Sequence, residues 1–133
     1  MRMIFVNLPV RNLEDSKGFF AKLGFRFEPA YTDDNAACMV VDENIFVMLL
    51  TEERFKDFIT GDISDATRAT EVLTCLSADS KQQVDETIEK ALAAGAKPWK
   101  PPMEDGPMYG GSFQDLDGHV WELLYMESPT QPG

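Results

Sequence analysis

The stretch Asp115-Leu-Asp-Gly-His-Val-Trp-Glu-Leu-Leu-Tyr125 joins a tight Asp-Gly turn to an apolar run that contains one carboxylate, Glu122. Asp-Gly flanked by apolar residues is a strong hairpin signal, so segments 111–114 and 120–126 are predicted to pair as strands. A carboxylate inside an apolar strand is costly to bury unless it is paired, protonated or bound to a metal. Glu122 is therefore the first candidate for a functional residue.

The same strand pattern occurs once more, earlier in the chain. Residues 47–53 are Val-Met-Leu-Leu-Thr-Glu-Glu, and residues 121–127 are Trp-Glu-Leu-Leu-Tyr-Met-Glu. This alignment places Met48 where the later copy has Glu122. The pattern indicates a duplicated unit in which one copy lacks the carboxylate.

The spacing between the two copies changes along the chain. Segments 5–12 and 73–80 align at a distance of 68 positions (73 − 5), whereas Met48 and Glu122 are 74 positions apart (122 − 48). The second copy is therefore expected to contain about six extra residues. The glycine-rich segment 103–111 is the expected place for them.

Each copy is predicted to follow the order strand, helix, strand, strand, strand. The predicted strands span 3–8, 25–31, 36–41 and 45–50 in the first copy, and 70–77, 96–100, 111–114 and 120–126 in the second. Caps and apolar spacing predict two helices, from Asn12 or Asp15 to about Leu23 and from Ser80 to just before Gly95. Pro9 is expected to end the first strand because it cannot donate to a ladder. Segment 103–111 is predicted to be a loop, either plain or acting as a lid.

The predicted fold class is α+β, with two tandem βαβββ modules that form a curved mixed sheet around a cavity and carry their helices on the outer face. The 133 residues are expected to form one domain. Within it we expect repeats at about 2–53 and 70–127, a connector at about 54–69 and a frayed tail at 128–133.

The composition is typical of a globular protein, because 44% of the residues are hydrophobic and 11% are aromatic. The net charge of −11 argues against a nucleic-acid partner and against an anionic membrane surface. No targeting or membrane-spanning segment is expected, since the apolar run 3–10 is too short. Cys38 and Cys75 are expected to be buried free thiols in a reducing cytosol, which favours a cytoplasmic location.

Several short motifs follow one another in a fixed order. They are Val10-Arg-Asn-Leu-Glu-Asp-Ser16 before Phe19-Phe20, then Leu23-Gly24-Phe25, Ala94-Gly95-Ala96, Phe113-Gln-Asp-Leu-Asp-Gly118 and Trp121-Glu122-Leu123. This order resembles the vicinal oxygen chelate superfamily, which includes glyoxalases, bleomycin- and fosfomycin-resistance proteins and extradiol dioxygenases. Within this superfamily, the sequence more closely resembles small bacterial proteins often labelled predicted lactoylglutathione lyase. The resemblance implies a homodimer, since members often build cavities across paired chains.

The resemblance also implies a metal site with one ligand from the first and last strand of each repeat. The matching positions in this sequence are Phe5, Met48, Leu73 and Glu122, where active members have His, Gln or Glu. Only Glu122 keeps a metal-binding side chain, and three protein ligands are the usual minimum for zinc. The resemblance therefore implies a degenerate metal site. No cofactor is expected, and a divalent metal is disfavoured.

Six residues form the candidate ligand-binding set: Phe5, Asn7, Met48, Leu73, Tyr109 and Glu122. Asn7 lies two residues after Phe5 and therefore on the same strand face. Glu122 has two open interpretations. It is an acid, base or hydrogen-bond partner for a ligand, or it is a remnant that is exposed or satisfied by Asn7 or Tyr109.

Three functions follow from these residues. The first is a metal-free protein that binds a small organic molecule in an apolar cavity lined by Phe5, Met48 and Leu73. The second is a metal-dependent, glyoxalase-type lyase or isomerase, or a dioxygenase-related enzyme. It would act through Glu122 as the catalytic residue, or through a metal site displaced by a strand register from the four positions above. The third is sequestration of a cationic drug such as bleomycin, which the acidic charge permits.

Overall fold

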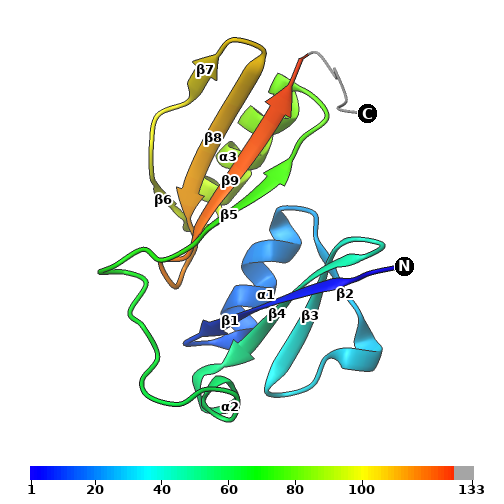
Figure 1. Ribbon diagram of the computed structural model, residues 1–133, viewed down its shortest axis with the longest axis vertical. Helices are drawn as coiled ribbons and strands as arrows, with labels where there is room; N and C mark the ends of the chain where they lie inside the picture. Colours follow the sequence, from blue (N-terminus) through cyan, green and yellow to red (C-terminus); the bar gives the residue numbers. More distant parts are fainter. Residues whose placement is uncertain (128–133) are drawn as a thin grey trace. The chain divides into compact units, whose positions relative to one another are not determined.

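The computed structural model describes residues 1–127 (Figure 1). The chain divides into two compact units, Met1–Asp65 and Ala66–Gly133. The repeats predicted at 2–53 and 70–127 fall one in each unit. The predicted frayed tail, 128–133, lies outside the described residues.

The first unit is built around a four-stranded sheet. Its elements are β1 (Ile4–Val10), α1 (Leu13–Lys22), β2 (Arg26–Phe27), a 3-10 turn η1 (Pro29–Tyr31), β3 (Ala36–Asp42), β4 (Ile45–Thr51) and a short helix α2 (Glu52–Lys56). The strand order is β1-β4-β3-β2, with β1 parallel to β4 and the other neighbours antiparallel. Helix α1 packs on β3 and β4.

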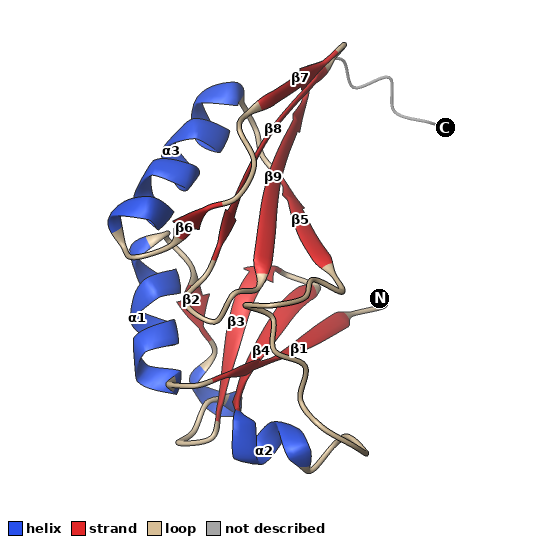
Figure 2. Cartoon of the chain, turned by 90° about the vertical axis from the view of Figure 1, so that its left-hand side faces the viewer, coloured by secondary structure: helices blue, strands red, loops and turns tan. Residues whose placement is uncertain are grey.

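The second unit repeats this plan with five strands. Its elements are β5 (Leu73–Ser77), α3 (Lys81–Ala93), β6 (Lys97–Pro98), β7 (Met103–Asp105), β8 (Met108–Gln114) and β9 (Val120–Met126). The strand order is β5-β9-β8-β6, β7 pairs with β8, and β5 is parallel to β9. Figure 2 shows the long helix of each unit lying along one face of that unit's sheet. The predicted α+β class with two βαβββ modules is confirmed, and the strands hydrogen-bond as two mixed sheets, one in each unit.

The two long helices start at the predicted caps. The Asn12 side chain accepts a hydrogen bond from the backbone N–H of Asp15 at 2.9 Å, and the Ser80 hydroxyl accepts one from the N–H of Gln83 at 3.0 Å. Each cap satisfies a donor that would otherwise be unpaired in the first helical turn. None of the helices within residues 1–127 is long and apolar enough to span a bilayer.

The strand registers confirm the duplication. Asn7 lies opposite Met48 in the parallel pair β1–β4, and Cys75 lies opposite Glu122 in the parallel pair β5–β9. Met48 and Glu122 therefore occupy the same position in the two sheets. Because the register of parallel strands determines which side chains share a face, the two copies present equivalent residues on equivalent faces.

The six extra residues of the second copy are divided between two places, so the prediction that they all lie in 103–111 is wrong. Helix α3 has 13 residues and α1 has 10, which accounts for three of them. The other three lie between β6 and β8. Phe27 pairs with Met39 twelve positions later (39 − 27), whereas Pro98 pairs with Phe113 fifteen positions later (113 − 98).

Two segments differ from their predicted secondary structure. The strand predicted over 25–31 is confined to β2, because Glu28 accepts a hydrogen bond from the N–H of Ala30 and Pro29 favours the first turn of a helix. The predicted loop 103–111 is instead the hairpin β7–β8. Its glycines have a packing role: a Cβ at Gly111 would lie 3.0 Å from the side chain of Ile88, so α3 approaches β8 closely there.

Pro9 does not end the first strand, which continues to Val10. Within residues 1–127, β1 is an edge strand that pairs with β4. A proline in an edge strand can direct its missing N–H away from the ladder, so it interrupts no hydrogen bond between strands.

The turn between β8 and β9 is held by the buried carboxylate of Asp115, which the sequence analysis did not identify. One oxygen accepts the backbone N–H groups of Asp117 and His119 at 2.9 and 3.0 Å, and the other accepts the indole N–H of Trp121 at 2.9 Å. Burial raises the pKa of the Asp115 carboxyl, while His119 and the Trp121 hydrogen bond limit that rise. Gly118 completes the turn with a φ of 90°, and a Cβ there would lie 2.7 Å from the backbone of Thr67.

Replacing Asp115→Ala is expected to lower the free energy of unfolding by about 2 to 4 kcal/mol, because the buried indole N–H and two backbone N–H groups lose their acceptor. Urea denaturation followed by circular dichroism measures this change. Glu127→Ala, an exposed carboxylate just beyond β9, is the control and should change stability by less than about 0.5 kcal/mol. Equal stability of the two variants would show that Asp115 does not hold the turn.

Candidate functional site

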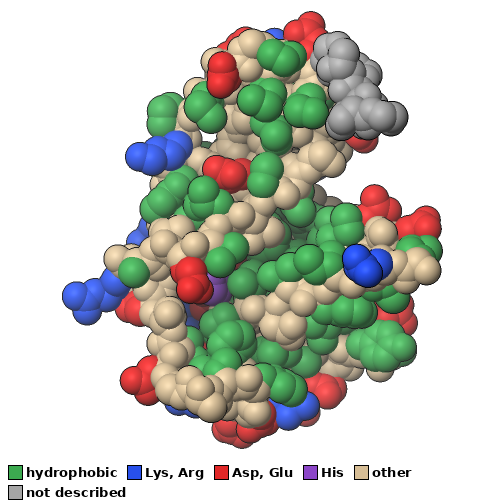
Figure 3. All heavy atoms as spheres, viewed as in Figure 1, with side chains coloured by type: hydrophobic (Ala, Val, Ile, Leu, Met, Phe, Trp, Pro, Cys, Tyr) green, Lys and Arg blue, Asp and Glu red, His purple; other side chains and the backbone are tan. Residues whose placement is uncertain are grey.

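One face of the first unit's sheet is turned away from α1. Along β4, Val47 and Leu49 are buried on the helix side, and strand alternation places Phe46 and Met48 on the opposite side. The register adds Phe5, which lies opposite Phe46, to that same side. This face is the open face of the first sheet, and Figure 3 shows hydrophobic side chains exposed over it.

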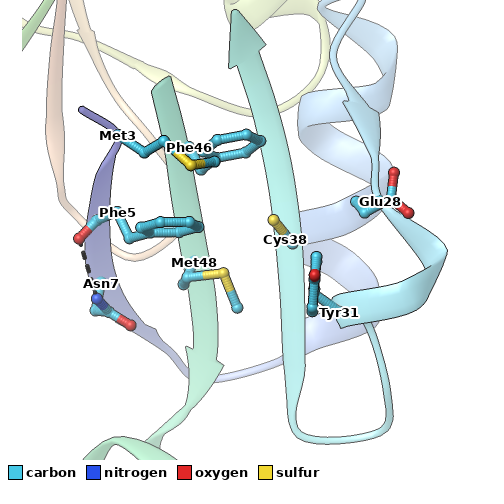
Figure 4. A pocket seen from close by; sticks show the side chains of 8 residues that line it. All are labelled: Met3, Phe5, Asn7, Glu28, Tyr31, Cys38, Phe46 and Met48. Carbon is cyan, nitrogen blue, oxygen red and sulfur yellow. Dashed lines mark hydrogen bonds between the residues drawn. The ribbon is translucent and has the colours of Figure 1, made fainter. Parts of the chain in front are cut away.

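The open face carries a pocket of about 650 Å³, a volume in the range of small-molecule sites. Figure 4 shows the eight residues that line it: Met3, Phe5, Asn7, Glu28, Tyr31, Cys38, Phe46 and Met48. All eight belong to the first unit. The structure therefore brings together the predicted site residues Phe5, Asn7 and Met48.

The part of the pocket over β1 and β4 is aromatic. The rings of Phe5 and Phe46 are stacked, with centroids 4.9 Å apart and planes inclined by 12°. Phe5 is 48% exposed, so this pair presents an aromatic surface to solvent. The Asn7 side chain donates a hydrogen bond to the carbonyl oxygen of Phe5 at 3.2 Å, which holds the amide beside the rings.

The part of the pocket over β3 and η1 is different in character. It contains the half-buried carboxylate of Glu28, the exposed ring of Tyr31 and the buried thiol of Cys38. Burial, and next the charge of Glu28, raise the pKa of the Cys38 thiol. Cys38 therefore stays protonated near neutral pH, and Glu28 is the one charged side chain among the eight lining residues.

The remaining predicted residues lie in the second unit. Leu73 and Cys75 of β5 share one face with Glu122 of β9, since Cys75 lies directly opposite Glu122 in the register. Leu73 is 52% exposed and Glu122 is half-buried. The thiol of Cys75 has its pKa raised by partial burial and, to a smaller extent, by the charge of Glu122.

The prediction that both thiols are buried is correct for Cys38 and wrong for Cys75, which is exposed. Both are free of disulfide bonds, as predicted. The exposure of Cys75 follows from strand alternation, because α3 packs on β8 and β9 from the side opposite to Glu122.

Tyr109 does not share a face with Glu122. Its neighbour along β8, Gly110, lies opposite Leu124, and Tyr109 itself lies on the helix side, where its hydroxyl donates to a carboxylate oxygen of Asp85 on α3 at 2.5 Å. This hydrogen bond is the main cause of the raised pKa of the Tyr109 hydroxyl. The suggestion that Tyr109 satisfies Glu122 is therefore wrong.

The paired βαβββ modules define the structural class of this protein, and comparison with known proteins defines its family. The chain belongs to the Glyoxalase/Bleomycin resistance protein/Dioxygenase superfamily, whose model matches residues 2–123. Its sequence has no match among curated proteins.

Solved structures with the same fold cover nearly the whole chain. A hypothetical protein from S. aureus has a TM-score of 0.80 and 26% identity, with 94% of each chain covered. A glyoxalase/bleomycin resistance protein/dioxygenase family enzyme from Burkholderia phytofirmans has a TM-score of 0.79 and 19% identity, covering 95% of this chain and 99% of the other. The fosfomycin resistance protein FosX from Listeria monocytogenes has a TM-score of 0.67 and 16% identity, covering 94% and 93%. At their identities, the last two show a shared fold alone.

The side chains at the four expected ligand positions do not fit a divalent metal. Phe5 and Leu73 have no donor atom, and Met48 offers only a thioether, which is a weak ligand for hard or borderline metal ions. Within residues 1–127, no three His, Cys, Asp or Glu side chains are grouped so that they could hold a metal ion. In the pairing of β5 with β9, the metal-binding side chain opposite Glu122 is the thiol of Cys75.

Five pocket residues were not predicted: Met3, Glu28, Tyr31, Cys38 and Phe46. Phe46 and Cys38 could have been found from strand alternation, because Phe46 is two residues from Met48 and Cys38 lies opposite Met48. Glu28 and Tyr31 could not, because their segment was predicted to be a strand and is instead the 3-10 turn that carries them to the pocket.

Replacing Glu122→Gln is expected to increase the rate at which Cys75 reacts with a disulfide reagent at pH 8 by roughly two- to fivefold. Removal of the carboxylate charge lowers the pKa of the thiol and so raises its thiolate fraction. Absorbance of the released thiolate measures the rate, and Cys75→Ser identifies the reacting group. Glu127→Gln, which removes the same charge elsewhere, should react at the wild-type rate. An equal increase in both variants would contradict the assignment to Glu122.

Proposed function

We propose that this protein binds a small organic molecule in the apolar pocket of its first unit, without a metal ion at the positions where other family members hold one. The observation that carries this proposal is the stacked pair Phe5–Phe46 beside Met48. Two of these three residues occupy expected ligand positions, and all three line a pocket of about 650 Å³.

The driving force for such binding is burial of apolar surface. Phe5 and Met3 are each 48% exposed, so the free protein leaves large apolar side chains in contact with water. Each square ångström of apolar surface removed from water contributes about 25 cal/mol. An aromatic ligand gains further from offset stacking on the exposed ring of Phe5.

Phe5→Ala is expected to weaken binding of the neutral fluorophore N-phenyl-1-naphthylamine by roughly tenfold, because it removes half of the stacked pair. The increase in fluorescence on binding gives the dissociation constant. Phe58→Ala is the matched control, since Phe58 is 63% exposed, belongs to the same unit and does not line the pocket. Wild-type affinity in Phe5→Ala, or an equal loss in Phe58→Ala, would contradict the proposal.

The second candidate function is a metal-dependent lyase or isomerase of the glyoxalase type. It is favoured by one observation, the retention of Glu122 at the last ligand position. In this candidate, Glu122 would hold the metal together with donors other than Phe5, Met48 and Leu73.

Metal analysis separates the two candidates. We expect purified protein to contain nickel, zinc and iron well below one equivalent per chain, and to show no turnover of the hemithioacetal formed from methylglyoxal and glutathione. Stoichiometric metal together with turnover that is lost in Glu122→Gln would establish the second candidate and overturn the first.

A further inference from the structure

We propose that the ligand of this pocket is an elongated aromatic amine, whose ring stacks on Phe5–Phe46 and whose ammonium group pairs with Glu28. This inference rests on the proposed function and adds the chemical class of the ligand. It follows from the different character of the two ends of the pocket and from the distance between them.

The aromatic end selects a flat ring. The Phe5 and Phe46 rings are stacked, with centroids 4.9 Å apart and planes inclined by only 12°, so a flat aromatic ring can continue the stack. Met3 and Met48 line the pocket beside this stacked pair (Figure 4). Thioether side chains adapt to the outline of an aromatic guest and contact ring edges favourably.

The opposite end selects a positive charge. Within residues 1–127, Glu28 forms no ion pair, and its one side-chain hydrogen bond is the 3.3 Å contact from the N–H of Ala30. The second carboxylate oxygen therefore has capacity to accept a hydrogen bond from a ligand. Tyr31 lines the same end, and its ring offers a cation–π surface to an ammonium group.

The electrostatics of the pocket disfavour an anionic ligand. No lysine, arginine or histidine is among the eight lining residues, and the chain has a net charge of −11. An anionic ligand would lose its hydration beside Glu28 without gaining a cationic partner. Glutathione adducts, which carry a net negative charge, are therefore poor candidates for this pocket.

The sheet determines the length of the ligand. Phe46 is on β4 and Glu28 directly follows β2, and β3 lies between these strands in the sheet order. Neighbouring strands are about 4.8 Å apart, so two spacings put the backbones of Phe46 and Glu28 about 10 Å apart across the sheet. A ligand that uses both sites needs a comparable distance between its ring and its basic nitrogen.

The test uses 6-phenylhexylamine, which spans this distance, and 6-phenylhexan-1-ol, its neutral analogue of equal length. Isothermal titration calorimetry at pH 7 is expected to show that the amine binds about tenfold more tightly than the alcohol, because both can donate to Glu28 but only the amine also carries the opposite charge. Benzylamine, which is too short to reach both sites, should bind more weakly than 6-phenylhexylamine.

Glu28→Gln is the decisive variant. Glutamine retains an oxygen that can accept from Ala30, so η1 is preserved while the charge is lost. We expect this variant to bind the amine and the alcohol with equal affinity. Glu43→Gln, which removes one charge from the exposed turn between β3 and β4, should keep the tenfold preference.

The outcomes distinguish this inference from the proposed function. If the amine and the alcohol bind the wild-type protein equally well, the pocket binds apolar ligands but Glu28 does not select a cation, and the inference alone is overturned. If the preference persists in Glu28→Gln, it arises from net charge, which also overturns the inference. If neither compound binds, the proposed function itself is overturned.

Discussion

Strand alternation against a helix on one face of the sheet is the constraint on which both units depend. Successive side chains of a strand point to opposite faces, so packing α1 on β3 and β4 commits Val47 and Leu49 to the core. The same packing leaves Phe46 and Met48 on the other face. A shift of one residue in the β1–β4 register would exchange the core side chains with those of the open face. One register therefore determines both which residues form the core and which line the pocket.

The two copies keep this geometry but use it for different chemistry. At equivalent positions, the first unit has Asn7, Cys38 and Met48, whereas the second has Cys75, Ser112 and Glu122. The first unit therefore presents an apolar pocket. The second presents a carboxylate beside a thiol, whose pKa is raised by partial burial and, to a smaller extent, by the charge of Glu122.

The family comparison and the site lead to separate conclusions. The family model places this chain in the Glyoxalase/Bleomycin resistance protein/Dioxygenase superfamily, yet three of the four ligand positions that the sequence resemblance implies hold apolar side chains. A fold is compatible with many functions, and the particular side chains of a site determine which chemistry is feasible. We therefore base the function on the pocket, where a stacked aromatic pair and a single acidic residue line a volume suited to a small molecule.

Much of the fold could be predicted from the sequence because its signals are local. The caps Asn12 and Ser80 mark the helix starts, and the Asp117-Gly118 turn marks the last hairpin. Other features depend on contacts that are distant in the sequence. Gly111 resembles a loop residue until α3 is seen to pack against it, and Asp115 gains its importance only from the indole of Trp121.

The same distinction applies to the site. Phe5 and Met48 were predicted from the resemblance and Asn7 from strand alternation with Phe5, and the register brings the three together. Glu28 and Tyr31 were missed because a short 3-10 turn is a weak sequence signal, and Tyr109 was misplaced because its strand begins earlier than predicted.

Methyl-labelled methionine offers the most direct test of the central claim, that the open face of the first sheet is the binding site. The chain has seven methionines; Met3 and Met48 line the pocket, whereas Met39 is fully buried on the opposite, helix-facing side. On titration with N-phenyl-1-naphthylamine, ring currents should shift the methyl signals of Met3 and Met48 in a saturable way and leave that of Met39 unchanged. Unchanged Met3 and Met48 signals, or larger shifts at Met103 or Met126 in the second unit, would contradict the account.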